Sequence, residues 1–265
     1  MKKHLIYQVK LGNNPLYDWC INSVKNYAES IDCDHIIQTE PILRITPDDK
    51  TTNRSKESIE KNGGFLPIFE KEVAFNYLDD YEKILILDGD IYVKPEAPNI
   101  FYALPPSFDF GAVVECDMPI TEEHRRKVLS YSKGQYTQLA AECKDWVYSP
   151  THGFPFHNMG LMLLNSASFK QYLKGMTPEQ FIRQEKFKRF VDGIGNWKWS
   201  TDQTLLNYWI RKEQMRIKNL NWKWNALYKG VKDDKLKEAY FVHFFLSEHK
   251  IKGKSFIQLE KEIGV

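Results

Sequence analysis

The sequence has few of the features that mark secreted, membrane-spanning or nucleic-acid-binding proteins. Its four cysteines include no Cys-X-X-Cys pair, which argues against a zinc site or a disulfide framework and favours a reducing compartment. No apolar run approaches the roughly 18 residues of a membrane helix, and the polar Met-Lys-Lys-His start is unlike a signal peptide. The 37 basic residues nearly balance the 35 acidic ones, so charge does not indicate nucleic-acid binding. We expect a cytoplasmic protein without a nucleic-acid partner.

What the chain does contain is enough apolar material for a large core. Its 265 residues are 42% hydrophobic and 14% aromatic, which suffices for one large α/β domain or two small ones. Residues 5–9 and 35–39 are strand-like, and between them Asn14-Pro15 begins a helix-like segment that extends to Glu29. A β-α-β opening is typical of nucleotide-binding α/β folds, although many other α/β proteins share it.

One stretch places two carboxylates directly after a strand. Residues 84–87 are an unbroken apolar run, and Asp88 and Asp90 follow it with Gly89 between them. Such a run is typical of a strand buried on both faces, and α/β sheets bind ligands beyond the carboxyl ends of their strands. Carboxylates at i and i+2 lie on one side of an extended chain and repel each other unless a cation such as Mn2+ or Mg2+ joins them. Gly89 would let a phosphate-bearing ligand approach the backbone closely. The alternative is a solvated Asp-X-Asp turn.

Other candidate site residues lie next to predicted strands or helices. Lys71 lies on a helix-like segment before the carboxylates, where it either faces a diphosphate or is solvated. Asn158 and Gly160 begin a second apolar strand, where an amide and a bare backbone suit a polar ligand. His243 lies in a third, residues 239–245, and is either a core residue or a metal ligand.

A helix start contributes a further carboxylate and amide. Asp202 and Gln203 follow Ser200 and Thr201, either of which can cap the helix. This carboxylate and amide could also face a sugar. At the other end of the chain, residues 250–261 are basic, so this stretch either contacts an anionic membrane surface or is solvated.

Five motifs in one order resemble those of glycosyltransferase family 8, the glycogenin and lipopolysaccharide galactosyltransferase group, whose members have the GT-A fold. The family patterns are YDKVLYLDAD, FNAGVMLLN, DQDILN, KWN and VHFxGxxKPW. The matching segments are, in the same order, Tyr81–Asp90, His157–Asn165, Thr201–Asn207, Lys223–Asn225 and Val242–Phe244. The resemblance covers most of the chain. It implies one GT-A domain over residues 1–265, with a Rossmann-like, mostly parallel central sheet flanked by helices. The nucleotide-sugar half would span about residues 1–115 and the acceptor side about 116–265.

The resemblance also implies a metal-dependent transfer of a hexose from a nucleotide-diphosphate sugar, with UDP as the expected nucleotide. Asp88, Asp90 and His243 would hold Mn2+ or Mg2+, which bridges the two phosphates. Asp202 and Gln203 would lie near the anomeric carbon, and the configuration at that carbon would be retained. The acceptor would be a glycan, a lipid-linked glycan or a protein.

Binding of the donor would involve residues on both sides of the metal. Asp88, Gly89, Asn158 and Gly160 would line the sugar, the ribose and the diphosphate. A lysine near the C-terminus would stabilise the charge on the distal phosphate.

The chain departs from the family patterns at several positions. Thr204 replaces a second aspartate, which removes a contact to the acceptor. Leu246 replaces the glycine after the histidine, and the expected phosphate-binding lysine is displaced. The phosphate contact therefore falls on Lys250 or Lys254, and the third metal ligand is His243, which lies in the strand, or His249.

Two other classes of protein fit parts of the sequence. A phosphatase of the haloacid dehalogenase type also has Asp-X-Asp after an apolar strand, but Tyr92 stands where that family has threonine. A non-catalytic module that binds a nucleotide sugar or a glycan would bind without turnover.

Overall fold

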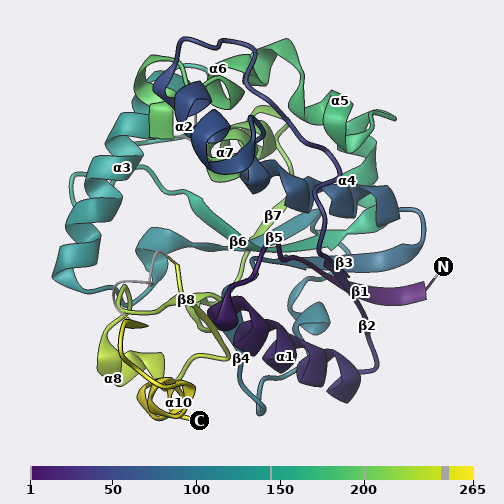
Figure 1. Ribbon diagram of the computed structural model, residues 1–265, viewed down its shortest axis with the longest axis vertical. Helices are drawn as coiled ribbons and strands as arrows, with labels where there is room; N and C mark the ends of the chain where they lie inside the picture. Colours follow the sequence, from purple (N-terminus) through teal and green to yellow (C-terminus); the bar gives the residue numbers. More distant parts are fainter. Residues whose placement is uncertain (1, 144, 200, 246–250) are drawn as a thin grey trace.

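A computed structural model describes residues 2–143, 145–199, 201–245 and 251–265, and the strands of these residues form two sheets. The larger sheet has six strands in the order β2-β1-β3-β6-β5-β7 (Figure 1). β6 runs antiparallel to both of its neighbours, and the others run in one direction. The strands are β1 (Lys2–Val9), β2 (Asp34–Gln38), β3 (Tyr81–Leu87), β5 (Phe110–Val114), β6 (His157–Asn165) and β7 (Ile217–Asn219). The mostly parallel central sheet is as predicted.

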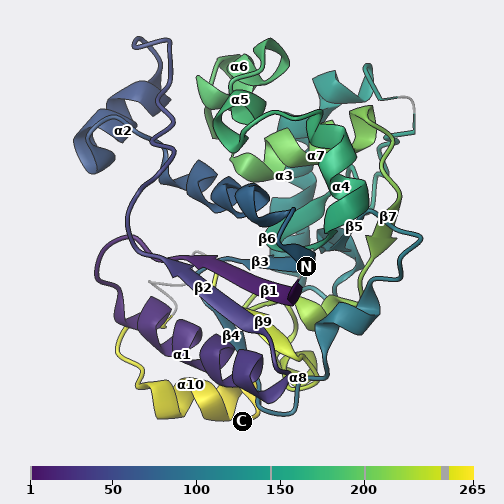
Figure 2. The same ribbon diagram turned by 90° about the vertical axis from the view of Figure 1, so that its right-hand side faces the viewer.

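Helices cover both faces of this sheet, which explains the continuous apolar runs in its central strands. All nine residues of β6 are buried, and so are Ile84 to Leu87 of β3. Figures 1 and 2 show α3 to α7 over one face and α1 under the other. The α-helices are α1 (Pro15–Ser30), α2 (Asn53–Asn62), α3 (Glu122–Ala140), α4 (Ser166–Leu173), α5 (Pro178–Ile182), α6 (Lys188–Val191), α7 (Asp202–Lys212), α8 (Asp233–Leu236) and α10 (Phe256–Ile263). Short 3-10 helices connect them: η1 (Pro67–Tyr77), η2 (Ile100–Ala103), η3 (Glu115–Asp117), η4 (Glu185–Phe187), η5 (Gly195–Trp199) and η6 (Trp222–Trp224).

Helix starts follow the capping signals in the sequence. The Asn14 side chain accepts a hydrogen bond from the Leu16 amide, and Pro15 occupies the first turn of α1. The Thr201 side chain accepts from the Gln203 amide, so Thr201 caps α7. The segment before β3 differs from the sequence prediction, because η1 is a 3-10 helix in place of an α-helix.

A second, smaller sheet lies beside α1 and α10, and the sequence analysis did not predict it. It has the order β4-β9-β8, formed by β4 (Ile91–Val93), β8 (Ala226–Leu227) and β9 (Phe241–His243). β4 pairs antiparallel with β9, which brings His243 into register with Ile91. The chain passes from the large sheet to the small one between β3 and β4. This junction consists of the Asp88-Gly89-Asp90 segment.

The C-terminal stretch is packed against the rest of the fold. Leu259 and Ile263 of α10 are fully buried, while Ile257 is exposed. Among the residues that the structure describes, no helix has both the length and the apolar content to cross a lipid bilayer.

Candidate metal and sugar-transfer site

Two carboxylates and one imidazole converge at the junction of the two sheets. One ligand atom each from Asp88, Asp90 and His243 lies within 4.8 Å of the others. The His243 Nε2 atom is 3.2 Å from Asp90 Oδ1 and 3.7 Å from Asp88 Oδ2. The sequence predicted these three residues as a cluster, and the structure brings them together. His249 lies outside the described residues, so the choice between the two histidines is not tested.

Backbone hydrogen bonds fix both carboxylates relative to the two sheets. The Asp88 amide donates to the Gly160 carbonyl at 2.8 Å, which extends the pairing of β3 with β6 beyond the end of β3. The Phe244 amide donates to the Asp90 carbonyl at 2.9 Å, which ties this residue to the end of β9. The geometry of the cluster is therefore set by strand pairing.

The donor atoms of this cluster suit a hard divalent cation. Carboxylate oxygens with one imidazole nitrogen are ligands that Mn2+ and Mg2+ accept. His243 is 1% exposed, and its Nε2 atom has no hydrogen-bond partner among the described residues. A buried nitrogen without a partner, aimed at two carboxylates, fits a site that a cation completes.

Gly160 is required by His243. A Cβ atom on Gly160 would lie 2.3 Å from His243 Cε1 and 2.7 Å from Nδ1. The bare backbone at Gly160 makes room for the imidazole ring. Gly89 is similar, because a Cβ there would lie 2.9 Å from the Val9 carbonyl oxygen and 3.0 Å from the Tyr17 ring. Contacts of either glycine to a donor stay predictions.

Lys71 joins the carboxylate cluster to the start of α7. Its Nζ atom is 2.8 Å from both Asp88 Oδ1 and Asp202 Oδ2, and it donates to the Met159 carbonyl at 2.7 Å. These three acceptors match the three N–H groups of an ammonium ion. Lys71 is 8% exposed, so it is neither solvated nor free to turn toward a diphosphate without giving up one of these contacts.

The buried charges shift each other's pKa values. Burial lowers the pKa of Lys71, but the carboxylates of Asp202 and Asp88 outweigh this and raise it above its usual value. Burial raises the pKa of Asp202, and the neighbouring Lys71 ammonium opposes this rise. Burial also lowers the pKa of His243, but Asp90 outweighs it and the net shift is upward. The site is thus a network of charges in which each depends on its neighbours.

Asp202 and Gln203 lie together at the first turn of α7, as predicted. The Gln203 Oε1 atom accepts from the Met159 amide at 3.2 Å, and its Nε2 atom donates to the Tyr131 hydroxyl at 3.4 Å. Tyr131 lies on α3. No motif marked it. The same hydroxyl lies 3.2 Å from Thr204 Oγ1, so the residue that replaces the family's second aspartate faces the protein interior.

Asn158 is held by protein groups on both ends of its amide. Its Nδ2 atom donates to Glu115 Oε2 at 2.9 Å, and its Oδ1 atom accepts from the Gly160 amide at 3.1 Å and from Asn225 Nδ2 at 2.9 Å. Asn225 belongs to the KWN motif, but it was given no role. Glu115 was missed, although an acid directly after the buried strand β5 repeats the arrangement of Asp88 after β3.

The predicted phosphate-binding lysines are not joined to this cluster by contacts within the described residues. The Lys254 ammonium pairs with Glu262 Oε1 at 2.5 Å and lies 3.0 Å from the Tyr228 hydroxyl, beside α10. Lys250 lies outside the described residues.

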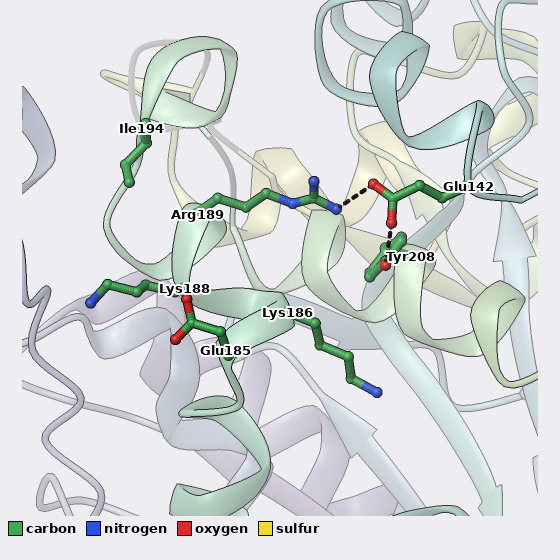
Figure 3. Close-up of a pocket in the computed structure, with 7 residues that line it drawn as sticks. All are labelled: Glu142, Glu185, Lys186, Lys188, Arg189, Ile194 and Tyr208. Carbon is green, nitrogen blue, oxygen red and sulfur yellow. Dashed lines mark hydrogen bonds and ion pairs between the residues drawn. The ribbon is translucent and has the colours of Figure 1, made fainter.

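A separate pocket lies between α6 and α7 (Figure 3) and contains none of the predicted site residues. Within it, Glu142 accepts hydrogen bonds from Arg189 at 2.9 Å and from Tyr208 at 2.6 Å. The lining residues are Glu142, Glu185, Lys186, Lys188, Arg189, Ile194 and Tyr208.

Comparison with known proteins gives structural but not sequence matches. No family model and no curated protein matches the sequence. An active-site mutant of LgtC, a galactosyltransferase, superposes with a TM-score of 0.53 at 12% identity, over 98% of this chain and 95% of that one. The chain has the GT-A glycosyltransferase fold. Mouse xyloside xylosyltransferase 1 has a TM-score of 0.50 at 15% identity, over 93% and 99% of the two chains. WbbM, a bifunctional glycosyltransferase, has a TM-score of 0.52 at 12% identity, over 92% of this chain and 46% of its own.

The GT-A fold gives the site a consistent place in the molecule. The cluster lies at the carboxyl end of β3, the edge at which α/β sheets bind ligands. The predicted GT-A fold and the mostly parallel central sheet are confirmed, while membership of family 8 stays a prediction because the identities are low.

Proposed function

We propose that this protein is a divalent-metal-dependent glycosyltransferase of family 8. It would transfer a hexose from a nucleotide-diphosphate sugar, with UDP as the nucleotide, to a hydroxyl of a glycan, a lipid-linked glycan or a protein, with retention of configuration. The observation that carries the proposal is the convergence of Asp88, Asp90 and His243 at the sheet junction, with Lys71 linking Asp88 to Asp202.

Asp88, Asp90 and His243 would hold the metal ion. When bound, Mn2+ or Mg2+ neutralises charge on the diphosphate leaving group. Lys71 fixes the position of Asp88 within this ligand set and of Asp202 at the start of α7. The three residues therefore form one unit whose shape is set before the donor arrives, which is how preorganised charge contributes to catalysis.

Asp202 and Gln203 would act at the sugar. The Asp202 carboxylate would stabilise positive charge that develops at the anomeric carbon. Burial raises its pKa, and the neighbouring Lys71 ammonium opposes this rise. Gln203 is anchored by Met159 and Tyr131, which fixes the orientation of its amide. Lys254 and Lys250 are the candidates for the distal phosphate.

The fold argues against the phosphatase alternative. That hypothesis needs the haloacid dehalogenase fold around Asp88 and Asp90, and the chain superposes on glycosyltransferases. The other alternative, a non-catalytic binding module, would differ from the proposed enzyme only in showing no turnover.

A thermal-shift screen of nucleotides and nucleotide sugars, each with Mn2+ or with EDTA, tests the proposal. A ligand that binds only the native state raises Tm by mass action, by about 2.7 kcal/mol of stabilisation at a hundredfold excess over Kd. We expect UDP or a UDP-sugar to raise Tm only with Mn2+, and the Asp90→Asn variant to lose this shift. A flat response to every nucleotide together with phosphatase activity would overturn the proposal. A shift without hydrolysis or transfer of any donor would favour the binding module.

A further inference from the structure

Asn225, which contacts the Nδ1 side of His243, belongs to a series of hydrogen bonds that joins the two sheets. His243 Nδ1 lies 3.1 Å from Asn225 Oδ1, and Asn225 Nδ2 donates to Asn158 Oδ1 at 2.9 Å. Asn158 Nδ2 then donates to Glu115 Oε2 at 2.9 Å. All four residues are at most 6% exposed, so water does not compete for these contacts.

The direction of each hydrogen bond follows from the two ends of this series. The Glu115 carboxylate can only accept, so the Asn158 atom facing it is the amide nitrogen. The Gly160 backbone amide can only donate, so the Asn158 atom facing it is the oxygen. Two independent groups therefore fix the same orientation of the Asn158 amide. Because its oxygen faces Asn225, Asn225 presents its nitrogen to Asn158 and its oxygen to His243.

The orientation of Asn225 determines which ring nitrogen of His243 carries the proton. An oxygen that can only accept requires a hydrogen on Nδ1. The lone pair of a neutral imidazole is then on Nε2, the atom that faces Asp88 and Asp90. We propose that Glu115, Asn158 and Asn225 are positioning residues that fix the Nδ1 proton of His243 and so present its Nε2 lone pair to the divalent ion. This inference rests on the proposed metal site and adds to it a device that orients one ligand.

The test compares two substitutions at Asn225, one that keeps an acceptor for the His243 Nδ1 proton and one that removes it. Asn225→Asp keeps an oxygen for the His243 Nδ1 proton, but its other oxygen faces Asn158 Oδ1 without a hydrogen, so the fold loses stability. Asn225→Leu removes the acceptor. Mn2+ affinity, measured by the EPR signal of free Mn2+, should fall about 10–100-fold in Asn225→Leu and stay near wild type in Asn225→Asp. Equal losses, or losses that follow stability, would overturn the proposal.

A matched control comes from β6, the strand that carries Asn158. Asn165 is also buried and donates to the Pro105 carbonyl at 3.0 Å, but it lies seven residues from Asn158 on β6, roughly 23 Å along the strand. Asn165→Leu should lose stability and keep its Mn2+ affinity. A comparable affinity loss in this variant would show that loosening β6 alone explains the effect.

Nitrogen-15 NMR of histidine in the wild-type protein needs no variant to fold. With Mg2+ bound, the proton of His243 should be on Nδ1; a proton on Nε2 would overturn the proposal. If wild type binds neither Mn2+ nor Mg2+, the proposed function fails separately. The metal-free spectrum still decides the hydrogen-bond chain, because Nδ1 should carry a proton at every pH at which the protein is folded.

Discussion

Gly160 shows how a missing side chain positions a candidate metal ligand. Its Cα hydrogen faces the His243 ring, and a Cβ there would lie 2.3 Å from Cε1. Gly160→Ala must therefore move the imidazole or the strand, at a cost of about 1–3 kcal/mol for overpacking, and should weaken Mn2+ binding. Chemical denaturation and Mn2+ EPR measure the two effects. Gly134 of α3 has nothing within 4 Å of its would-be Cβ, so Gly134→Ala should stabilise the protein by about 0.4–1 kcal/mol.

Glu72 is a buried carboxylate without a hydrogen bond. It is 1% exposed, and neither oxygen has a partner among the described residues. Burial raises its pKa well above the usual value, the charge of Asp202 adds to this rise, and Lys71 opposes it. The folded protein therefore binds more protons than the unfolded chain once the pH exceeds the unfolded pKa of about 4.3. The contribution of Glu72 to the free energy of unfolding therefore falls as the pH increases toward its pKa in the folded protein.

Glu72→Gln should remove this pH dependence. We expect the variant to be more stable than wild type at pH 7, with a difference that grows between pH 5 and pH 8 by at most about 1.4 kcal/mol per pH unit. Urea denaturation across this range measures the difference. Glu60, which is exposed on α2, provides the control, since Glu60→Gln should change stability little at any pH. A difference that does not vary with pH would contradict the explanation.

At the scale of secondary-structure elements, Lys71 connects η1 with β3 and α7. The side chains of Lys71 and Asp202 are 10% and 8% exposed, so removing either leaves the other charge buried. We expect Lys71→Met to destabilise the protein by roughly 3–5 kcal/mol, and a double variant with Asp202→Asn to recover part of that loss. A double-mutant cycle in urea measures the coupling. Lys170→Met tests an exposed pair with Asp79 and should cost under about 1 kcal/mol.

Elements were predicted most accurately where local pattern decides them. The apolar runs of β3 and β6, the Asn14 cap of α1 and the Thr201 cap of α7 all depend on neighbours a few residues away. η1 was expected as an α-helix because its apolar spacing is helical, and the tighter 3-10 form is a choice that this spacing does not encode. Register in the small sheet also escaped prediction, since strands of two or three residues carry too little pattern.

At the scale of the whole molecule, the two sheets meet at the candidate site. Asp88 follows β3 and Asp90 precedes β4, while Gly160 lies within β6 and His243 ends β9. The resemblance to family 8 predicted the fold and grouped the metal ligands. The cytoplasmic location, the acceptor and the contact with a membrane surface stay predictions.

The buried strands, the helix starts and the carboxylates that follow β3 were predictable from the sequence alone, because burial and capping leave periodic or adjacent patterns in the chain. The groups that those residues meet depend on how the strands and helices pack. Lys71 reaches Asp202, Gly160 accommodates His243, and Glu115 orients Asn158 through contacts between residues 43 to 131 positions apart. Such side-chain contacts need one partner at one distance and no repeating pattern, so they become visible only when the strands and helices are packed together.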